Sequence, residues 1–430
     1  MGIPTVGIVT DPFIKDAETS AEGEGMHLRD VVMTHPVTQT GSAAKEKAKA
    51  AMDKIIKGLT APLTEEEKKT GFLERPKPPR IAVRGTLEEI QEYFRANNWT
   101  DGLPIIPPTE EAVRKMLTGT SHSPDKVIGL MPPENWKVTV EGVAINAVMA
   151  GCKPKHMPVL LAMIEAFMKQ KLFFSTVRST TSFSFPVVVN GPIAKEIGMN
   201  SGLGALGGLG ADPSPNAAIG RALRLSIVNL GGSVIGINDM GAIGNPARDT
   251  FSFAENEKES PWKPLHVDMG YKPEESVVTV FTGGWFAAGP GTLATLDPKV
   301  HVKTLVKELK AFGGPYGAMI VLTPLLAQQF AKEGFTKKDL QELLWKEASV
   351  TFGEWWKLEW ISGLMEPRIG QPGWWPAWYR DRTISPEKIV PLFPSPETIR
   401  IVVVGVGSNP FHQTRHLHKD FATVSVDKWR

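Results

Sequence analysis

Short β-branched runs alternate with helical periodicities along the chain. The first residues, Gly2 to Thr10, form an apolar, β-branched run that is typical of a buried parallel strand. An acidic, helix-like stretch near Ala17 to Glu24 follows, and then a helix from Ser42 to Gly58 with a narrow apolar stripe. One strand and two helices cannot cover a parallel strand on both faces, so these roughly sixty residues indicate half of an α/β domain.

A charged, proline-rich stretch separates this half-domain from the rest of the chain. It contains Thr64 to Lys69 and Pro76 to Pro79, a composition typical of linkers. We therefore expect a half-domain over residues 1–60, a linker over 61–80, and a larger domain over 81–430 that is divisible near residue 300.

Strands and helices alternate after residue 80, which predicts an α/β fold with a mixed sheet and long loops. The expected strands are Ile81 to Val83, Lys137 to Ala144, Phe185 to Val189, Phe251 to Ala254, Val277 to Thr282 and Arg400 to Val404. The expected helices are Thr86 to Asn97, a helix capped by Thr109, His156 to Gln170, Asn216 to Leu230, Val302 to Ala311, Pro324 to Lys332 and Thr336 to Glu347.

Composition limits the classes of function. A chain of 430 residues with 42% hydrophobic and 22% charged residues is globular and long enough for two or three domains. Forty-eight basic against 46 acidic residues leave a net charge of +2, so nucleic acid is not an expected partner. We see no apolar run of about 20 residues and no secretory signal pattern, so no membrane association is expected.

A single cysteine, Cys152, excludes an intrachain disulfide and a zinc or iron–sulfur site built from thiolates. This usage fits a reducing compartment, and we expect the protein to be cytoplasmic. Cys152 follows Gly151 at a strand-to-helix junction, where helix N–H groups, two nearby lysines and His156 would lower the thiol pKa. Cys152 as nucleophile with His156 is one hypothesis, and a buried structural cysteine is the other. Asn146, at the start of the same segment, is a candidate contact for substrate.

Asp101 is the second candidate for chemistry. It lies in an Asp-Gly-Leu-Pro turn between a helix end that contains Trp99 and a loop with two consecutive prolines. A carboxylate held rigidly there could act as a general base or a metal ligand. An ordinary turn residue is the alternative, because aspartate before glycine is common in turns.

The glycine-rich run from Gly202 to Gly210 contains a formal GxGxxG pattern. The pattern lacks the preceding strand and following helix that a dinucleotide site requires, so it does not indicate such a site. A better anion site lies beyond it, where Asn216 is expected to cap a helix that carries Arg221. A solvent-facing arginine is the alternative for Arg221.

Two further segments carry polar side chains suited to chemistry. Glu255 ends a short strand and lies close in sequence to His266, which suggests an acid–base or metal pair. Three histidines within His412 to His418 suggest either a metal site or a surface loop. Six tryptophans between Trp355 and Trp378 indicate an aromatic loop over a pocket or a small hydrophobic core.

Several of these segments together resemble one known family. They are Gly2 to Val6 with Thr10 and Phe13, His35-Pro36, Leu59-Thr60, Asp101 to Pro104, Ala150 to Pro154 and Asn216 to Leu225. They are similar to the UGSC family of selenoproteins and their cysteine homologues. That family resembles the selenocysteine-bearing, substrate-specific subunit of glycine and betaine reductases, in which a selenol or thiol attacks the substrate. The resemblance implies redox or carbon–heteroatom cleavage chemistry.

The reactive motif of that family is absent from this chain. In the family, the Gly-Ser-Cys motif lies upstream of the strand with which this sequence opens. We expect either a separate subunit to supply it, or an in-frame UGA to have been taken as a stop with translation assigned from Met1. The half-domain inferred from burial requires the same missing piece.

Three hypotheses follow for function. In the first, the chain is a component of a thiol- or selenol-dependent oxidoreductase or carbon–heteroatom-cleaving enzyme that acts on a small polar or acidic substrate. Cys152 and His156 would then be catalytic, and Asn216 with Arg221 would hold an acidic group. The second is a metal-assisted hydrolase or lyase using Asp101, Glu255, His266 or the C-terminal histidines, the metal ion being its only implied cofactor. The third is a non-catalytic subunit that completes a partner, or a homo-oligomer.

Overall fold

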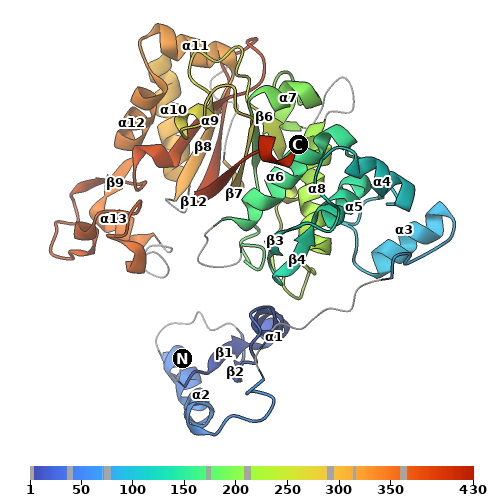
Figure 1. Ribbon diagram of the computed structural model, residues 1–430. Helices are drawn as coiled ribbons and strands as arrows, with labels where there is room; N and C mark the ends of the chain where they lie inside the picture. Colours follow the sequence, from blue (N-terminus) through green and yellow to red (C-terminus); the bar gives the residue numbers. More distant parts are fainter. Residues whose placement is uncertain are drawn as a thin grey trace.

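The computed structural model describes residues 4–35, 42–69, 71, 79–170, 176–207, 215–287, 295–312, 316–358 and 366–430. The described chain forms a small N-terminal unit, which ends near Gly71, and a large domain from residue 79 onward (Figure 1). None of the described helices is both long and apolar enough to traverse a bilayer.

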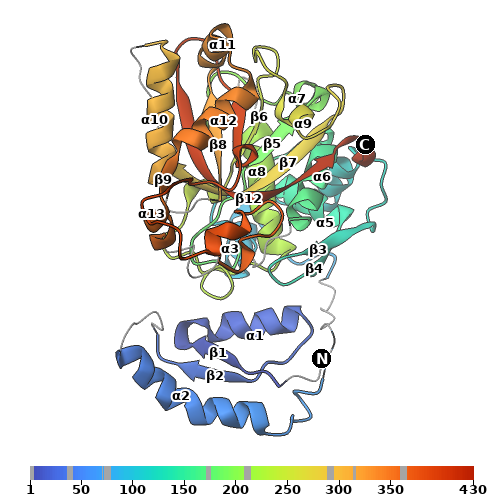
Figure 2. The same ribbon diagram turned by 90° about the vertical axis from the view of Figure 1, so that its left-hand side faces the viewer.

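The N-terminal unit is a two-stranded parallel sheet with one helix on each face. Strand β1 (Gly7–Thr10) pairs in parallel with β2 (Asp30–Met33). A short 3-10 turn, η1 (Asp11–Phe13), leads into α1 (Ile14–Gly23), and α2 (Ser42–Thr60) follows β2. Figure 2 shows α1 and α2 on opposite faces of the sheet. The predicted opening strand and both helices are therefore present, together with a second strand.

The first part of the predicted linker is folded onto this unit. The Arg29 guanidinium donates to the Glu67 carboxylate at 2.7 and 2.6 Å and to the carbonyls of Gly58, Ala61 and Pro62. The hydrogen bond from Arg29 lowers the pKa of Glu67 to about 2. This partly buried contact joins residues 38 positions apart and ties Glu67 to the N-terminal unit.

Arg178 joins the N-terminal unit to the large domain. Its Nη1 donates to the carboxylate of Asp16 at 2.5 Å and to the hydroxyl of Thr19 at 3.1 Å, both on α1. Its Nη2 donates to Glu134 at 2.8 Å and to the carbonyl of Pro133 at 3.1 Å. The two figures agree in placing α1 on the side of the unit that faces the large domain (Figures 1 and 2).

A six-stranded mixed sheet organises the large domain. Its strand order is β11-β8-β12-β7-β5-β6. The strands are β5 (Val187–Asn190), β6 (Ser252–Ala254), β7 (Val277–Ala287), β8 (Gly317–Leu322), β11 (Ile399–Val403) and β12 (His412–Ser425). The pairs β5–β6 and β8–β11 are parallel and the remaining pairs antiparallel, so the expected mixed α/β sheet is confirmed.

Three hydrophobic cores share this sheet, and two of them contain most of the helices. The first core contains α3 (Leu87–Ala96), α4 (Glu110–Leu117), α5 (Val140–Met149), α6 (Met157–Met168), α7 (Pro192–Ile197) and α8 (Pro215–Asn229). The second contains α10 (Pro298–Ala311), α11 (Pro324–Lys332), α12 (Lys337–Glu347) and α13 (Phe352–Lys357). Because β12 is hydrogen-bonded to strands on both sides of residue 300, one continuous sheet spans the position where a division was considered.

Smaller elements complete the domain. They are the hairpin of β3 (Val127–Met131) and β4 (Trp136–Thr139), the pair β9 (Ser349–Thr351) and β10 (Ile389–Pro391), α9 (Leu265–Asp268), and the 3-10 turns η2 (Pro154–His156), η3 (Ala205–Gly207), η4 (Pro246–Arg248), η6 (Glu366–Arg368), η7 (Ala377–Arg380), η8 (Pro396–Thr398) and η9 (Asp427–Trp429). Trp355 and Trp375 are fully buried in the second core, so the tryptophan-rich segment contributes to a hydrophobic core.

Two predicted strands are wrong. Residues 81–83 form no regular element, and Val83 packs against the helical core instead of pairing with a strand. The strand expected over Lys137 to Ala144 ends at Thr139. The Thr139 hydroxyl accepts the N–H of Gly142 at 3.1 Å and caps α5, so the apolar residues that follow form a buried helix.

The surface loop considered for His412 to His418 is also wrong, because this segment forms part of a central strand. His412, His416 and His418 lie in β12 and are all buried. Alternate positions of a strand share one face, which explains why these histidines lie together. Glu308 on α10 accepts from the His412 ring at 3.2 Å, and Tyr316 stacks on His418.

Candidate functional site

Cys152 lies at the end of α5, inside the first core. Its N–H bonds to the carbonyl of Ala147, and its side chain is buried among apolar residues. Burial raises the pKa of the Cys152 thiol to about 12. The thiolate expected from neighbouring lysines and a helix terminus is therefore not favoured, because the loss of solvation outweighs those charges.

His156 cannot activate the thiol as predicted. Its Nδ1 accepts the N–H of Lys153 at 3.1 Å, so the ring closes the turn that begins α6. Burial, together with the charges of Lys155 and Lys153, lowers the pKa of His156 to about 4. His156 is thus a neutral, structural imidazole at neutral pH.

The Cys152 thiol should therefore be unreactive in the folded chain. We expect no fast reaction with Ellman's reagent at pH 8, and one equivalent after unfolding in guanidinium chloride, because only the thiolate attacks the disulfide. The same titration on Cys152→Ser measures the background. A full equivalent within seconds from the native chain would contradict this placement.

His156 should make stability depend on pH. The unfolded ring titrates near its ordinary value of 6.5 and the folded ring near 4, so only the unfolded state takes up the proton between these values. The free energy of unfolding should fall as pH falls from 6.5 to 4, by about 3 kcal/mol from this group. Urea unfolding at pH 7 and pH 5 should show about 2 kcal/mol of this decrease. The His156→Gln variant should lose that part of the difference, and an unchanged difference would argue against it.

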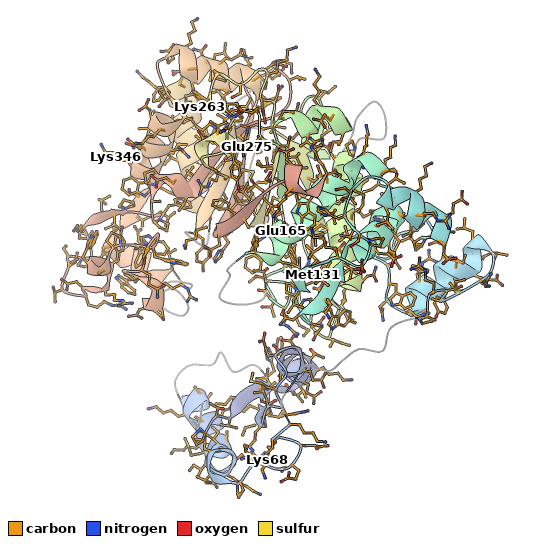
Figure 3. The ribbon with its side chains drawn as sticks, viewed as in Figure 1. Lys68, Met131, Glu165, Lys263, Glu275 and Lys346 are labelled. Atoms are coloured by element: carbon orange, nitrogen blue, oxygen red, sulfur yellow. The ribbon has the colours of Figure 1, made fainter. Side chains whose placement is uncertain are left out.

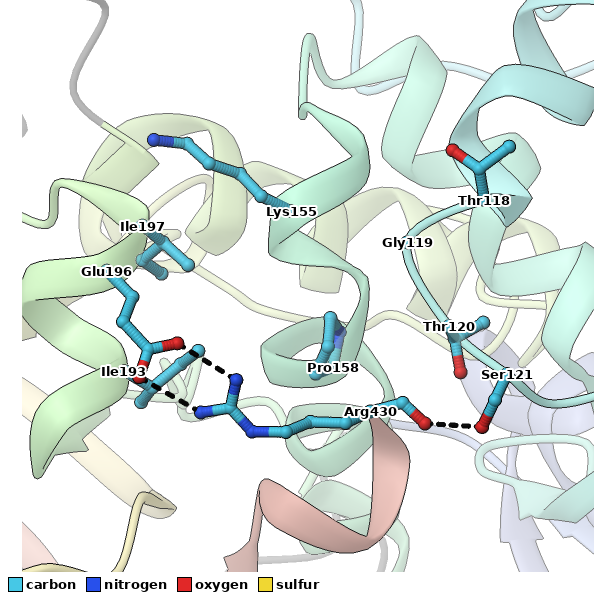
Figure 4. A pocket seen from close by; sticks show the side chains of 10 residues that line it. All are labelled: Thr118, Gly119, Thr120, Ser121, Lys155, Pro158, Ile193, Glu196, Ile197 and Arg430. Atoms are coloured by element: carbon cyan, nitrogen blue, oxygen red, sulfur yellow. Dashed lines mark hydrogen bonds and ion pairs between the residues drawn. The ribbon is translucent and has the colours of Figure 1, made fainter.

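A cavity of about 520 Å³ lies beside this segment but not at Cys152 (Figure 4). Lys155 and Pro158 form one wall, and Glu196 pairs with Arg430 across another at 2.9 Å. The Ser121 hydroxyl donates to the Arg430 carbonyl at the cavity edge. Neither Cys152 nor His156 lines the cavity, so it supports no role for that pair.

Asp101 and Arg221, predicted for different roles, bind each other. Arg221 donates to the two carboxylate oxygens of Asp101 at 2.8 and 2.9 Å and to the carbonyl of Pro104 at 2.9 Å. The Asp101 side chain is almost fully buried. Burial raises the pKa of Asp101. The hydrogen bonds from Arg221 and from the N–H of Leu103 lower it by more than burial raises it, so the net shift is downward. This ion pair fixes the proline-rich loop to α8 and neutralises the buried Asp101 carboxylate.

Asn146 and Asn216 are also used in packing. Asn146 on α5 donates to the carbonyl of Gly142 and accepts from Asn229 on α8 at 2.8 Å. Asn216 exchanges two hydrogen bonds with the backbone of Asn200 and donates to the carbonyl of Ala205. Asn216 is the second residue of α8, which begins at Pro215, so it is not the helix cap that was expected.

A buried charge cluster lies further along α8. Asp239 accepts from Arg248 at 2.6 Å and from Arg224 at 3.1 Å, and all three side chains are buried. Arg224 therefore faces the interior, although sequence patterning favoured a solvent-facing arginine on this helix. The cluster holds the loop 233–248 against α8.

The best-placed polar cluster gathers at the carboxyl ends of the parallel strands β5 and β6. Asn190, the last residue of β5, donates from Nδ2 to Glu255 at 2.8 Å and to Glu257 at 2.9 Å. Glu255 also accepts the N–H of Leu265 at 2.8 Å. Burial raises the pKa of Glu255. The carboxyl ends of parallel strands are frequent sites of ligands in α/β folds.

His266 completes this cluster. Its ring is fully buried, with Nδ1 at 3.9 Å from Oε1 of Glu257. Neither ring nitrogen has a hydrogen-bond partner among the described residues, and the same is true of the Asn190 amide oxygen. Buried polar atoms are normally satisfied by protein or water, so three such atoms in one cluster mark a place for water or a small polar molecule.

The cluster suits proton transfer. A buried carboxyl with a raised pKa, Glu255, shares the Asn190 amide with Glu257, whose side chain is 28% exposed and therefore reachable from solvent. Glu255 also accepts the N–H of Leu265, the residue before His266, and the His266 ring lies 3.9 Å from Glu257. Asn190 and Glu257 were missed, although Asn190 ends a strand and Glu257 follows Glu255 by two positions.

Metal binding receives no support from the described part of the chain. No group of three or more His, Cys, Asp or Glu side chains suited to a metal ion occurs there. Glu165, labelled in Figure 3, illustrates how acidic groups are used instead: it accepts from Lys428 at 2.7 Å and from the Trp429 indole at 2.8 Å.

Comparison with known proteins gives one match. The sequence model of the UGSC family matches residues 1–61. No curated protein and no solved structure matches the chain. The predicted resemblance to the UGSC family is therefore confirmed over the N-terminal unit.

Proposed function

We propose that this chain is a component of a thiol- or selenol-dependent enzyme, an oxidoreductase or carbon–heteroatom-cleaving enzyme, whose reactive thiol or selenol is supplied by a partner polypeptide. The observation that carries the proposal concerns Cys152. It is the single cysteine of the chain, and burial raises its pKa to about 12. A thiol-dependent reaction must then take its nucleophile from elsewhere. The UGSC match over residues 1–61 supports this class of chemistry.

In this proposal the large domain contributes acid–base groups. Glu255, Glu257 and His266 form the cluster best suited to receive a small polar substrate group. Thiol or selenol attack needs a proton to be delivered to the leaving group, and a buried carboxyl whose pKa is raised keeps its proton to a higher pH than an exposed one.

Alkylation of the purified complex tests the proposal. A tagged chain isolated from its own cells should carry one rapidly alkylated thiol or selenol, which peptide mapping should place on a partner. Iodoacetamide should abolish dithiothreitol-dependent turnover of small polar acids and amines, and Cys152→Ser should leave both alkylation and turnover intact. Loss of both in Cys152→Ser would overturn the proposal, as would a chain that carries no partner thiol or selenol.

Glu257→Gln should reduce turnover in that complex. The substitution keeps the side-chain shape but removes the solvent-reachable carboxylate, and general acid–base groups contribute about 10²- to 10⁴-fold to rates. We expect kcat to fall within this range and the melting temperature to stay within a few degrees. Glu274→Gln, on an exposed carboxylate, is the matched control. Equal activity of the two variants would remove Glu257 from the proposed site.

A further inference from the structure

The sheet of the N-terminal unit has one covered and one open position on the same face. Ile8 of β1 and Val31 of β2 are opposite each other in register and therefore share a face. Val31 is 5% exposed and Ile8 57% exposed. Helix α2 packs on β2, whose neighbouring residue Val32 is exposed on the other face, so α2 covers Val31 and leaves Ile8 open. No described strand pairs with the second edge of β1.

Helix α2 carries an apolar stripe that nothing in the described chain covers. Ala51 is buried against the sheet, whereas Met52, Ile56 and Leu59 are exposed. Their spacing of four and then three residues places these three side chains in one row. Apolar residues thus occupy a wider sector of α2 than its contact with β2 uses.

Exposed apolar side chains concentrate in this unit. Eight of the twenty large apolar side chains that are exposed in the described chain lie within residues 4–71: Ile8, Met26, Leu28, Val32, Met52, Ile56, Leu59 and Leu63. A monomeric surface rarely carries such density, which marks an interaction surface. Both views show α2 on the side of the unit away from the large domain, so the large domain does not cover it (Figures 1 and 2).

We propose that a partner polypeptide completes this unit by adding a parallel strand to the free edge of β1 and packing a helix against Met52, Ile56 and Leu59. The proposal rests on the proposed function, since it assigns the docking site of the partner that carries the thiol or selenol. Parallel strands require cover on both faces, and a strand with its crossover helix provides both the pairing and the cover.

The charge of α2 indicates which kind of partner surface would fit it. Helix α2 carries five lysines against one glutamate and one aspartate. Lys45 and Lys49 fall at helical spacing beside the apolar stripe, so an acidic helix is the complementary surface. A second copy of this chain docked through the same face would set two lysine-rich helices against each other, and like charges at an interface oppose association.

Site-specific photo-cross-linking tests the docking site. Benzoylphenylalanine replaces Ile8 or Ile56 in the full chain, expressed in its own cells, and Ile243, which is 99% exposed on the large domain, provides the control position. Positions 8 and 56 should cross-link to one polypeptide other than this chain, within a strand–helix segment whose helix is acidic. Position 243 should not. The double variant Lys45→Glu/Lys49→Glu should reduce the cross-link yield at least tenfold.

The outcomes separate this proposal from the proposed function. Cross-links from positions 8 and 56 only to a second copy of the chain, or none while the two positions react freely with solvent, would overturn the docking site. The docking site would also be overturned if the partner that carries the alkylated thiol or selenol cross-links to this chain only at positions other than 8 and 56. The proposed function would still stand in that case. A cross-linked acidic strand–helix partner without a reactive thiol or selenol would support the docking site and contradict the function.

Discussion

In the Arg178→Ala variant, residues 4–71 should detach from the large domain. Arg178 donates to Asp16 on one side and to Glu134 on the other, and the side chains of Arg178 and Glu134 are buried. Removing the guanidinium leaves two carboxylates without their partner, and breaking a buried pair costs about 3–5 kcal/mol. The docking equilibrium should therefore shift by about 10²- to 10³-fold, at 1.4 kcal/mol for each factor of ten.

Hydrogen exchange and small-angle scattering measure this detachment. Amides of α1 should exchange faster, the radius of gyration should increase, and the melting temperature of the large domain should change little. Arg178→Lys should give an intermediate result, because an ammonium keeps the charge but lacks the planar fork with which the guanidinium spans Asp16 and Glu134. Arg95→Ala, at an exposed ion pair, should behave as wild type. Unchanged exchange in α1 would show that Arg178 does not hold the unit in place.

Asp239→Asn should destabilise the large domain by about 3–5 kcal/mol, because two buried guanidinium groups lose their shared counter-charge. Arg224 and Arg248 both pair with Asp239, at 3.1 and 2.6 Å. Burial already lowers the pKa of Arg248, so its charge depends on this carboxylate. An amide of the same shape can accept from one guanidinium but carries no charge.

Urea unfolding at pH 7 should show the loss, with Asp249→Asn as the matched control. Asp249 is the neighbouring acid, and burial raises its pKa, so the fold gains little from its charge. We expect the control to stay within about 0.5 kcal/mol of wild type. Similar losses in the two variants would mean that the pairing at Asp239 is not the stabilising contact.

Periodic, amphipathic helices were predictable from the sequence. Helix α11 has the predicted bounds, Pro324–Lys332, and α12 and α8 differ from prediction by a single residue at each altered end. Helices α11 and α12 each bury one face, which imposes the 3.6-residue period, whereas α8 is buried over most of its length. Buried segments were harder to assign. β8 (Gly317–Leu322) is buried at every position, so no alternation marks it as a strand, and it was missed.

The candidate site was predictable only in part. Glu255 and His266 were chosen because they follow a strand and lie near each other in sequence, and in the fold Glu255 accepts the N–H of Leu265 while His266 lies 3.9 Å from Glu257. Asp101 and Arg221 are 120 positions apart, so nothing local could reveal that each neutralises the other. The pKa of Cys152 was predicted in the wrong direction because sequence shows the neighbouring charges but not the apolar side chains that surround the thiol.

The position of β12 has a consequence for biosynthesis. It is the last strand along the chain, yet it lies between β7 and β8 near the middle of the sheet. Until the ribosome has released His412–Ser425, the facing edges of β7 and β8 lack their partner and offer unpaired backbone groups to other nascent chains. The sheet of the large domain is therefore completed only once β12 has been synthesised, and a fragment that lacks His412–Ser425 is expected to expose these two strand edges and to aggregate.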